Sequence, residues 1–230
     1  MKTTAIVLAA GKGSRMKSKI EKQFMLLGDY PVLYYALKTF EKSPVDEIIL
    51  VTGKDSIDYC RKEMAEKYHL KKVRSIIEGG ANRYDSVYQG LQACSDTDFV
   101  IIHDGARPFV TVDMIETLLK TLKTYKACTV GMPVKDTIKI VDENGIGIDT
   151  PPRNTLWQIQ TPQGFDYGCL FSCYRKMMAE TPDVTDDTMV VERYGKEAVK
   201  VVEGGYFNIK ITTPEDMKIG LEILKNFDAF

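Results

Sequence analysis

The chain has 230 residues, with 31 Lys and Arg against 32 Asp and Glu, which gives a formal net charge of −1. This balance excludes a mainly electrostatic nucleic-acid binder, whose domains have a pI above about 9. Hydrophobic residues make up 44% of the chain and charged residues 27%, which excludes a disordered protein and suffices for one sizeable core. We therefore expect residues 1–230 to form one domain.

The sequence lacks the features typical of membrane and secreted proteins. No segment approaches the roughly 18 to 20 consecutive apolar residues that a membrane span needs. The N-terminus leads into a short apolar run without the architecture of a signal peptide. The five cysteines are an odd number without C-x-x-C spacing, which favours neither a zinc site nor a disulfide framework. We expect a cytoplasmic protein that binds neither membranes nor nucleic acid.

Short β-branched runs alternate with longer amphipathic stretches along nearly the whole chain. The predicted strands are Thr4–Leu8, Glu47–Thr52, Val73–Ile77, Phe99–His103, Cys128–Pro133, Val199–Val202 and Phe207–Ile211. The predicted helices are Pro31–Phe40, Ser56–Lys67, Tyr84–Ala93, Val112–Tyr125, Asp166–Ala179 and Pro214–Phe227. This alternation predicts an α/β fold with a Rossmann-like, mostly parallel sheet and helices on both faces.

The segment from Lys135 to Arg153 interrupts this alternation. Polar and apolar residues alternate over 137–141, and Asp142-Glu143-Asn144-Gly145 is typical of a hairpin turn. An isolated hairpin is only marginally stable in water. We therefore expect residues 135–153 to form an arm that packs on a second subunit, which makes the protein a homodimer. A mobile surface hairpin is the alternative.

The first predicted strand runs into a loop suited to phosphate groups. Its sequence is Leu8-Ala9-Ala10-Gly11-Lys12-Gly13-Ser14-Arg15-Met16, and Lys22 follows shortly after. Small residues let the backbone N–H groups approach a ligand, and the basic residues supply positive charge. The loop matches neither the P-loop nor the dinucleotide pattern. A plain strand-to-helix turn is the alternative.

Two later strand ends point to the same crevice. Gly79-Gly80 and Ser86 follow the third predicted strand, and His103-Asp104-Gly105-Ala106-Arg107 follows the fourth. Ligands of open α/β sheets bind outside the carboxyl ends of strands. Asp104 suits Mg²⁺, which takes one or two protein carboxylates together with phosphate oxygens. The alternative is a structural Asp104–Arg107 ion pair, and we interpret His103 as structural.

The remaining polar segments are weak signals when each is taken alone. Lys210 lies in an apolar run and could extend from a sheet edge, and Asp186-Asp187 could be a solvated helix cap. The sequence contains neither a nucleophile elbow nor an H-E-x-x-H motif, so hydrolysis by a nucleophile or by zinc has little support.

Taken together, the motifs resemble the 2-C-methyl-D-erythritol 4-phosphate cytidylyltransferase family, GT-A-like nucleotidyltransferases of the non-mevalonate isoprenoid pathway. They are Leu8-Ala-Ala-Gly11-x-Gly13-x-Arg15-Met16, Gly79-Gly80-x-x-Arg83-x-Asp85-Ser86-Val87, His103-Asp104-x-Ala106-Arg107-Pro108, Pro133-Val134-x-Asp136-Thr137, Arg153-x-x-Leu156-Trp157-x-x-Gln160-Thr161-Pro162-Gln163, Thr185-Asp186 and Asn208-Ile209-Lys210. Two residues depart from the family pattern, since Glu21 replaces a usual Pro and Ser14 a residue that is often basic.

The resemblance implies transfer of a cytidylyl group from CTP to methylerythritol phosphate, with Mg²⁺ and release of pyrophosphate. The implied catalytic residues are Arg15, Lys22, Arg153 and Lys210. The implied CTP contacts are Leu8, Ala9, Ala10, Gly11, Lys12, Gly13, Gly80, Ser86, Asp104 and Gly105. The implied sugar-phosphate contacts are Asp104, Arg107, Thr137, Arg153, Thr161, Thr185 and Lys210. Asp104 would lie near the metal, and the arm would complete the site of the other subunit.

Three other functions remain as alternatives. The sister enzyme ribitol 5-phosphate cytidylyltransferase has, by comparison, a Gly-Gly pair at Ala9-Ala10 and a bulkier residue at Ala106, and it lacks the Arg153-x-x-Leu-Trp157 string. A nicotinamide-dependent dehydrogenase would need an acidic residue where Thr52-Gly53 stands. A non-catalytic nucleotide-binding protein would have no reason to keep both Arg15 and Lys22.

Overall fold

The computed structural model describes residues 1–11, 16, 20–180 and 183–227. A seven-stranded sheet forms its centre, in the order β11-β7-β10-β6-β1-β4-β5. Its strands are β1 (Thr3–Ala9), β4 (Glu47–Thr52), β5 (Val73–Glu78), β6 (Phe99–Asp104), β7 (Ala127–Pro133), β10 (Trp157–Asp166) and β11 (Val199–Glu203). Neighbouring strands pair in parallel except at β10, which is antiparallel to both β6 and β7. The predicted α/β class and mostly parallel sheet are confirmed.

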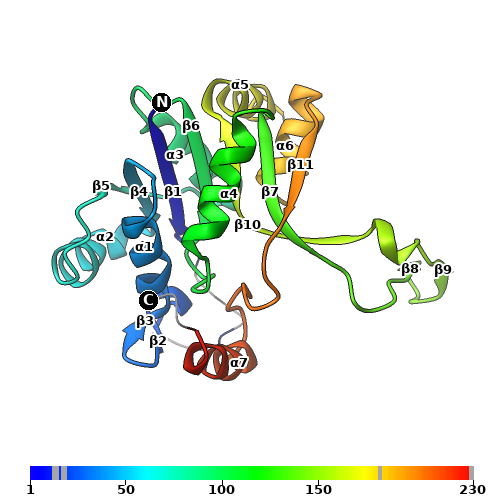
Figure 1. The fold of residues 1–230 in the computed structure, drawn as a ribbon, viewed down its shortest axis with the longest axis horizontal. Coiled ribbons are helices and arrows are strands. Elements are labelled where there is room, and N and C mark those ends of the chain that lie inside the picture. Colours follow the sequence, from blue (N-terminus) through cyan, green and yellow to red (C-terminus); the bar gives the residue numbers. More distant parts are fainter. Residues whose placement is uncertain (12–15, 17–19, 181–182, 228–230) are drawn as a thin grey trace.

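Helices cover both faces of this sheet (Figure 1). Successive side chains of a strand point to opposite faces, so Ala5 and Val7 pack in one core cluster with α1 while Ile6 packs in another with α3 and α5. None of the described helices has the length and apolar character needed to cross a bilayer. The helices are α1 (Val32–Lys42), α2 (Ile57–Tyr59), α3 (Arg83–Gln92), α4 (Val112–Leu122), α5 (Tyr167–Met177), α6 (Asp187–Val190) and α7 (Pro214–Lys225).

Short elements connect these parts. Two π-helical segments continue α2 and α6, and α7 packs near a two-stranded ribbon through a cluster that contains Leu27, Phe109 and Ile211. The bounds are η2 (Lys22–Phe24), β2 (Leu26–Leu27), β3 (Tyr30–Pro31), η3 (Lys54–Ser56), η4 (Cys60–Glu66), η5 (Arg153–Thr155) and η6 (Val191–Gly195).

The structure corrects two predicted elements and adds a strand to the sheet. Residues 207–211 form no strand, because Ile211 and the polar Asn208 are both buried in an irregular segment whose backbone is not paired with the sheet. The predicted helix Ser56–Lys67 is α-helical for only three residues before its π-helical part. Strand β10 was not predicted, because its Pro162 and Gly164 are poor strand formers.

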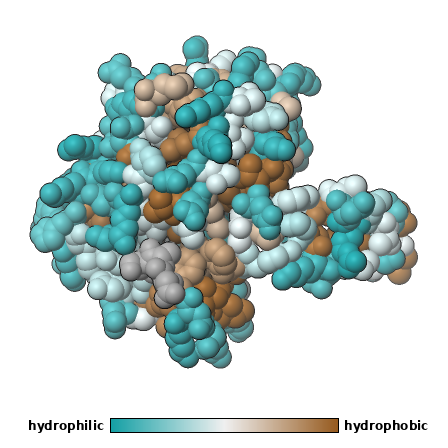
Figure 2. Space-filling view, viewed as in Figure 1, coloured by the Kyte–Doolittle hydropathy of each residue, from teal (hydrophilic) through white to brown (hydrophobic). Residues whose placement is uncertain are grey.

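The arm of residues 135–153 projects from the body of the molecule (Figure 1). Its paired strands are short, β8 (Ile140–Val141) and β9 (Gly147–Asp149), and the predicted turn between them includes Gly145 at φ +80°. Ile146 and Ile148 near the tip are 65% and 67% exposed, and Figure 2 shows apolar surface there. The hairpin is confirmed, and its contact with a second subunit stays a prediction.

Candidate active site

A cavity of about 1050 Å³ opens at the carboxyl ends of β1, β4, β5 and β6. This is the edge of an open parallel sheet where ligands bind. Its walls combine stretches of small residues with charged side chains, and those in the described part of the chain are four basic and four acidic residues. The lining residues are Leu8, Ala9, Ala10, Gly11, Glu21, Lys22, Gln23, Gly53, Lys54, Asp55, Glu78, Gly79, Gly80, Ala81, Asn82, Arg83, Ser86, Gln89, Asp104, Ala106 and Lys210.

The segment that carries Lys22 is fastened to the end of β1. Gln23 is 1% exposed, and its side-chain amide donates to the carbonyl of Ala9 at 2.6 Å. The same amide donates to the Glu21 carboxylate, which also accepts from the Ser56 hydroxyl at 3.4 Å. Glu21, the departure from the family pattern, thus braces this wall against the loop after β4. The predicted contacts Lys12, Gly13 and Arg15, together with Ser14, lie outside the described residues.

The opposite wall depends on two glycines and the first turn of α3. A side chain at Gly79 would lie 2.6 Å from the Ala10 Cβ, and one at Gly80 only 2.2 Å from the Asp85 Cβ, so the backbone must stay bare here. The Ser86 hydroxyl accepts from the Gly80 amide at 3.1 Å. The predicted contacts Gly80 and Ser86 are therefore brought together at the cavity.

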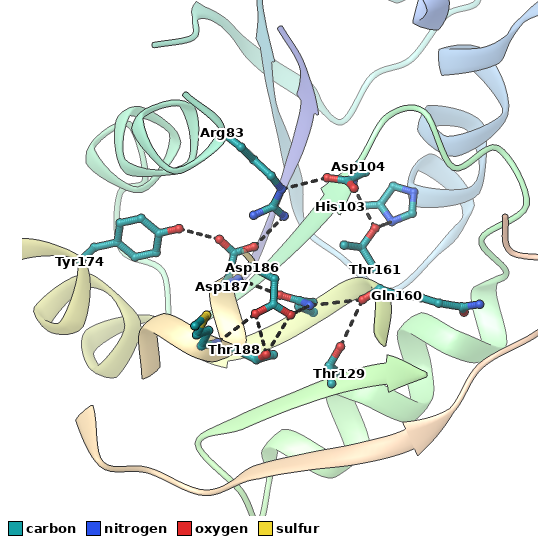
Figure 3. A network of polar contacts seen from close by, with 12 residues as sticks. Arg83, His103, Asp104, Thr129, Gln160, Thr161, Tyr174, Asp186, Asp187 and Thr188 are labelled. Atoms are coloured by element: carbon teal, nitrogen blue, oxygen red, sulfur yellow. Dashed lines mark hydrogen bonds and ion pairs between the residues drawn. The ribbon is translucent and has the colours of Figure 1, made fainter. Parts of the chain in front are cut away.

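Asp104 lies at the centre of a charged network at the end of β6 (Figure 3). One carboxylate oxygen is 3.2 Å from Arg83 Nε, and the other is 2.6 Å from Lys210 Nζ. Burial by itself would raise the pKa of Asp104, but the charges of Arg83 and Lys210 hold it well below its usual range. Asp104 is therefore ionised, and its ion pairs are not with Arg107.

Arg83 continues this network to Asp187, which is fully buried. Arg83 Nη2 lies 2.8 Å from Asp187 Oδ2, and the Tyr174 hydroxyl donates to the other oxygen of Asp187 at 2.5 Å. The neighbouring Asp186 caps α6 by accepting from the Met189 amide. The helix-cap alternative is correct for Asp186 alone. Arg83 and Asp187 were missed as site residues, although Arg83 stands in a recognised motif.

Three predicted contacts lie behind the cavity wall. Thr161 is 4% exposed, and its hydroxyl binds the Asp104 amide and His103 Nδ1. Gly105 packs behind β1, where its amide donates to the Leu8 carbonyl at 2.8 Å. Arg107 Nη1 donates to the Asn208 carbonyl at 2.8 Å, while its buried Nε has no hydrogen-bond partner within the described part of the chain.

Three further predicted contacts lie away from the cavity. Thr137 and Arg153 are exposed on the arm, where Arg153 Nη1 donates to the Lys135 carbonyl at 3.1 Å. Thr185 is exposed beside a separate recess of about 20 Å³ near Tyr174. One chain therefore assembles Leu8 to Gly11, Lys22, Gly80, Ser86, Asp104 and Lys210 at its cavity, and leaves the arm residues outside it.

Comparison with known proteins identifies the family. The family model described as 2-C-methyl-D-erythritol 4-phosphate cytidylyltransferase (IspD) matches residues 3–226. The chain belongs to this family. Among curated cytidylyltransferases of that name, the protein from Lachnospira eligens is 52% identical over 96% of this chain and 99% of its own. The one from Clostridium novyi is 50% identical over 98% and 97%.

Solved cytidylyltransferase structures have the same fold. The 4-diphosphocytidyl-2C-methyl-D-erythritol synthase of Anaerococcus prevotii has a TM-score of 0.87 at 36% identity, covering 97% of this chain and 96% of that one. The 2-C-methyl-D-erythritol 4-phosphate cytidylyltransferase of Thermus thermophilus has a TM-score of 0.81 at 26% identity, covering 98% and 100%. The resemblance inferred from the motifs is confirmed.

Proposed function

We propose that this protein transfers a cytidylyl group from CTP to 2-C-methyl-D-erythritol 4-phosphate, a reaction of isoprenoid precursor biosynthesis. A phosphate oxygen of the sugar attacks the α-phosphorus of CTP. The bond to the β-phosphate breaks, and the products are 4-diphosphocytidyl-2-C-methyl-D-erythritol and pyrophosphate. The observation that carries this proposal is the cavity that joins Lys22, Asp104 and Lys210 to the backbone around Gly80 in a member of this family.

The attacking phosphate is already anionic, so the reaction needs no general base. Catalysis then depends on positioning the two phosphates and on stabilising negative charge. We assign charge stabilisation to Lys22 with Arg15, and positioning of the sugar phosphate to Lys210, Arg107, Thr185 and the arm residues Thr137 and Arg153. Leu8 to Gly13, Gly80, Ser86 and the Asp104-Gly105 strand end would hold CTP.

Mg²⁺ fits the donors at this cavity. Asp104 presents one carboxylate, and among the described residues each of its oxygens pairs with a single cation, which leaves lone pairs available. Mg²⁺ takes one or two protein carboxylates and completes its shell with phosphates and water. Within residues 1–11, 16, 20–180 and 183–227, no three His, Cys, Asp or Glu side chains form a metal-binding group. When bound, the ion would be held mainly by the triphosphate and would offset its charge.

The arm supports a second part of the proposal, a homodimer with shared sites. Its Ile146 and Ile148 are exposed, and its Arg153 lies outside the cavity of its own chain. Exposed apolar side chains at the hairpin tip would be stabilised by burial against another protein surface. We propose one domain over residues 1–230, in the cytoplasm, with the arm of each subunit reaching the other subunit's cavity.

A pyrophosphate-release assay tests the reaction. CTP and Mg²⁺ are supplied with either methylerythritol phosphate or ribitol 5-phosphate as acceptor. We expect release with methylerythritol phosphate and little with ribitol phosphate. A preference for ribitol phosphate would assign the protein to the sister activity, and binding of CTP without release from either acceptor would make it a nucleotide-binding protein.

A further inference from the structure

We propose that His103 and Thr161 act together as positioning residues, which hold the loop of residues 104–107 so that Asp104 meets Arg83 and Lys210. The inference rests on the proposed function, because the loop belongs to the proposed site. It gives a role to His103, a buried histidine that the reaction itself does not use. It also makes Thr161 a residue that acts through Asp104 and not by touching the substrate.

The Thr161 hydroxyl sits between the two other groups (Figure 3). Its oxygen is 3.0 Å from the Asp104 amide nitrogen and 3.1 Å from His103 Nδ1. The other ring nitrogen, Nε2, is 3.1 Å from the Arg107 carbonyl oxygen. His103 is fully buried, and the Phe40 ring packs at 5.3 Å from its centroid.

The chemistry of these groups fixes the direction of every hydrogen bond. The Arg107 carbonyl can only accept, so His103 Nε2 must carry the proton in the neutral ring. His103 Nδ1 is then an acceptor, and the Thr161 hydroxyl must donate to it. The hydroxyl oxygen accepts in turn from the Asp104 amide. A chain of three bonds thus runs from the Asp104 amide to the Arg107 carbonyl.

These three hydrogen bonds hold the loop of residues 104–107 at both ends, at the Asp104 amide and at the Arg107 carbonyl. Within the loop, the Arg107 amide donates to the Asp104 carbonyl at 2.9 Å, which makes a tight turn. The Ala106 carbonyl, also in this loop, accepts from the Ile211 amide at 2.8 Å. This bond ties the loop to the segment that carries Lys210. Losing the Thr161 hydroxyl would free the Asp104 amide and displace its carboxylate from both cationic partners.

Thr161 lies in a β-bulge of strand β10, and this bulge places its side chain beside Asp104 and His103. The pairing with β7 steps from Ile159 opposite Gly131 to Gln163 opposite Thr129, so four residues of β10 pass two of β7. Such bulges re-aim side chains next to functional sites. The Thr161 carbonyl accepts from Asn208 Nδ2 at 2.9 Å, so the bulge is also fixed to the Lys210 segment.

Substitutions of Thr161 and His103 test this chain of three hydrogen bonds, which we call the relay. Thr161→Val keeps the shape and removes the hydroxyl, whereas Thr161→Ser keeps the hydroxyl. We expect Thr161→Val to lower kcat on the order of 10- to 100-fold with KM for the sugar phosphate nearly unchanged, because misplaced reacting groups slow the reaction. Thr161→Ser should restore the activity. Thr39→Val is the matched control, since Thr39 is 2% exposed and its buried hydroxyl has no partner in the described chain.

A double variant separates a relay from two independent effects. His103→Phe fills the same space beside Phe40 and should lower kcat as Thr161→Val does. Because both changes break one chain of bonds, the double variant should lose little more than either single variant. A rise in KM for the sugar phosphate confined to Thr161→Val would show direct substrate contact and overturn the proposal, as would a Thr161→Ser protein as impaired as Thr161→Val.

A spectroscopic measurement tests the relay without activity. The chain has two histidines, and His69 is exposed, so ¹⁵N-histidine labelling gives an internal reference. At neutral pH we expect His103 to be protonated at Nε2 and unprotonated at Nδ1, and Thr161→Val to shift the Nδ1 signal alone. A proton on Nδ1 would overturn the relay. Should the unmodified protein release no pyrophosphate, the proposed function fails and this measurement alone decides the relay.

Discussion

The cavity and the arm hold their charged side chains in opposite ways. Asp104 is 7% exposed, and both of its carboxylate oxygens are paired with cations from distant parts of the chain. Arg153 is exposed, and its side chain donates a hydrogen bond to the Lys135 carbonyl on the other side of the arm. The cavity residues are held by packing and ion pairs within one chain, whereas the arm residues Thr137 and Arg153 are exposed.

This difference separates two requirements of one site. A group fixed before the substrate arrives loses little freedom on binding and is effective in stabilising charge. The arm needs another surface to fix it, so its contribution depends on assembly. The division can be tested because substitutions in the two regions should change different measurements.

The largest effect is expected at the cavity. Lys22→Ala should lower kcat on the order of 10²- to 10³-fold, the usual cost of removing one preorganised charge-stabilising group. Sedimentation should show an unchanged oligomeric state. Lys120→Ala on the exposed side of α4 is the control and should leave turnover unaffected. Near-normal turnover of the Lys22 variant would refute the charge-stabilising role.

Mixed subunits should show whether the arm serves the other subunit's site. Lys22→Ala and Arg153→Ala chains, each inactive alone, are coexpressed with different tags. Random pairing leaves one intact site in each heterodimer if arms cross, so about a quarter of full activity should return. Purified heterodimers without activity would instead mean that the arm serves its own chain.

Acid should destabilise the cavity region through His103. Burial lowers the pKa of His103 to about 4, below its unfolded value of about 6.5. The unfolded chain therefore takes up the proton first, so this stabilisation is present above pH 6.5 and is lost as the pH falls toward 4. At pH 5 the loss should be on the order of 2 kcal/mol.

Urea unfolding at pH 7 and pH 5 measures this loss. The His103→Phe protein should lose less stability between the two pH values than the unmodified protein. An equal loss in both would assign the acid sensitivity to other groups.

The smallest effect on folding stability is expected at the tip of the arm. Ile148 is 67% exposed, so Ile148→Ala should change the free energy of unfolding of the chain by less than about 0.5 kcal/mol. The same substitution at the fully buried Ile102 should cost about 2 to 5 kcal/mol. Sedimentation should show that Ile148→Ala weakens the dimer. An unchanged dimer would exclude the tip from the subunit contact.

The sequence predicted the parts of the fold that follow local rules. The predicted strand Glu47–Thr52 matches the structure at both ends, because a short continuous apolar run is typical of a strand buried on both faces of a sheet. Residues 207–211 alternate apolar and polar side chains as a strand would but form none, since burial of side chains such as Ile211 does not require a paired backbone. Strand β10 could not be predicted, because its pairing is set by the neighbours β6 and β7 and not by its own composition.

The sequence also predicted part of the site, namely the residues that local patterns mark. Glycines and charged residues at strand ends pointed to the cavity, because the edge of a parallel sheet gathers them. The role of Arg83 depends on Asp187, which is 104 residues away along the chain, and no local pattern reports such a pair. The basic residues that the resemblance implies for the site divide as well. Lys22 and Lys210 line the cavity, Arg107 lies behind it and Arg153 lies on the arm, while Arg15 lies outside the described residues.

Strand β10 begins at the root of the arm and ends in the sheet, and this gives the two regions unequal tolerance to change in length. Residues can be added or removed at the hairpin turn without disturbing anything that pairs with the sheet. Between Trp157 and Gln163, however, a shift of one residue would turn the side chains of the strand to opposite faces. For engineering, the length of the arm is therefore adjustable, while the length of the segment from Trp157 to Gln163, which already pairs with the sheet, is not.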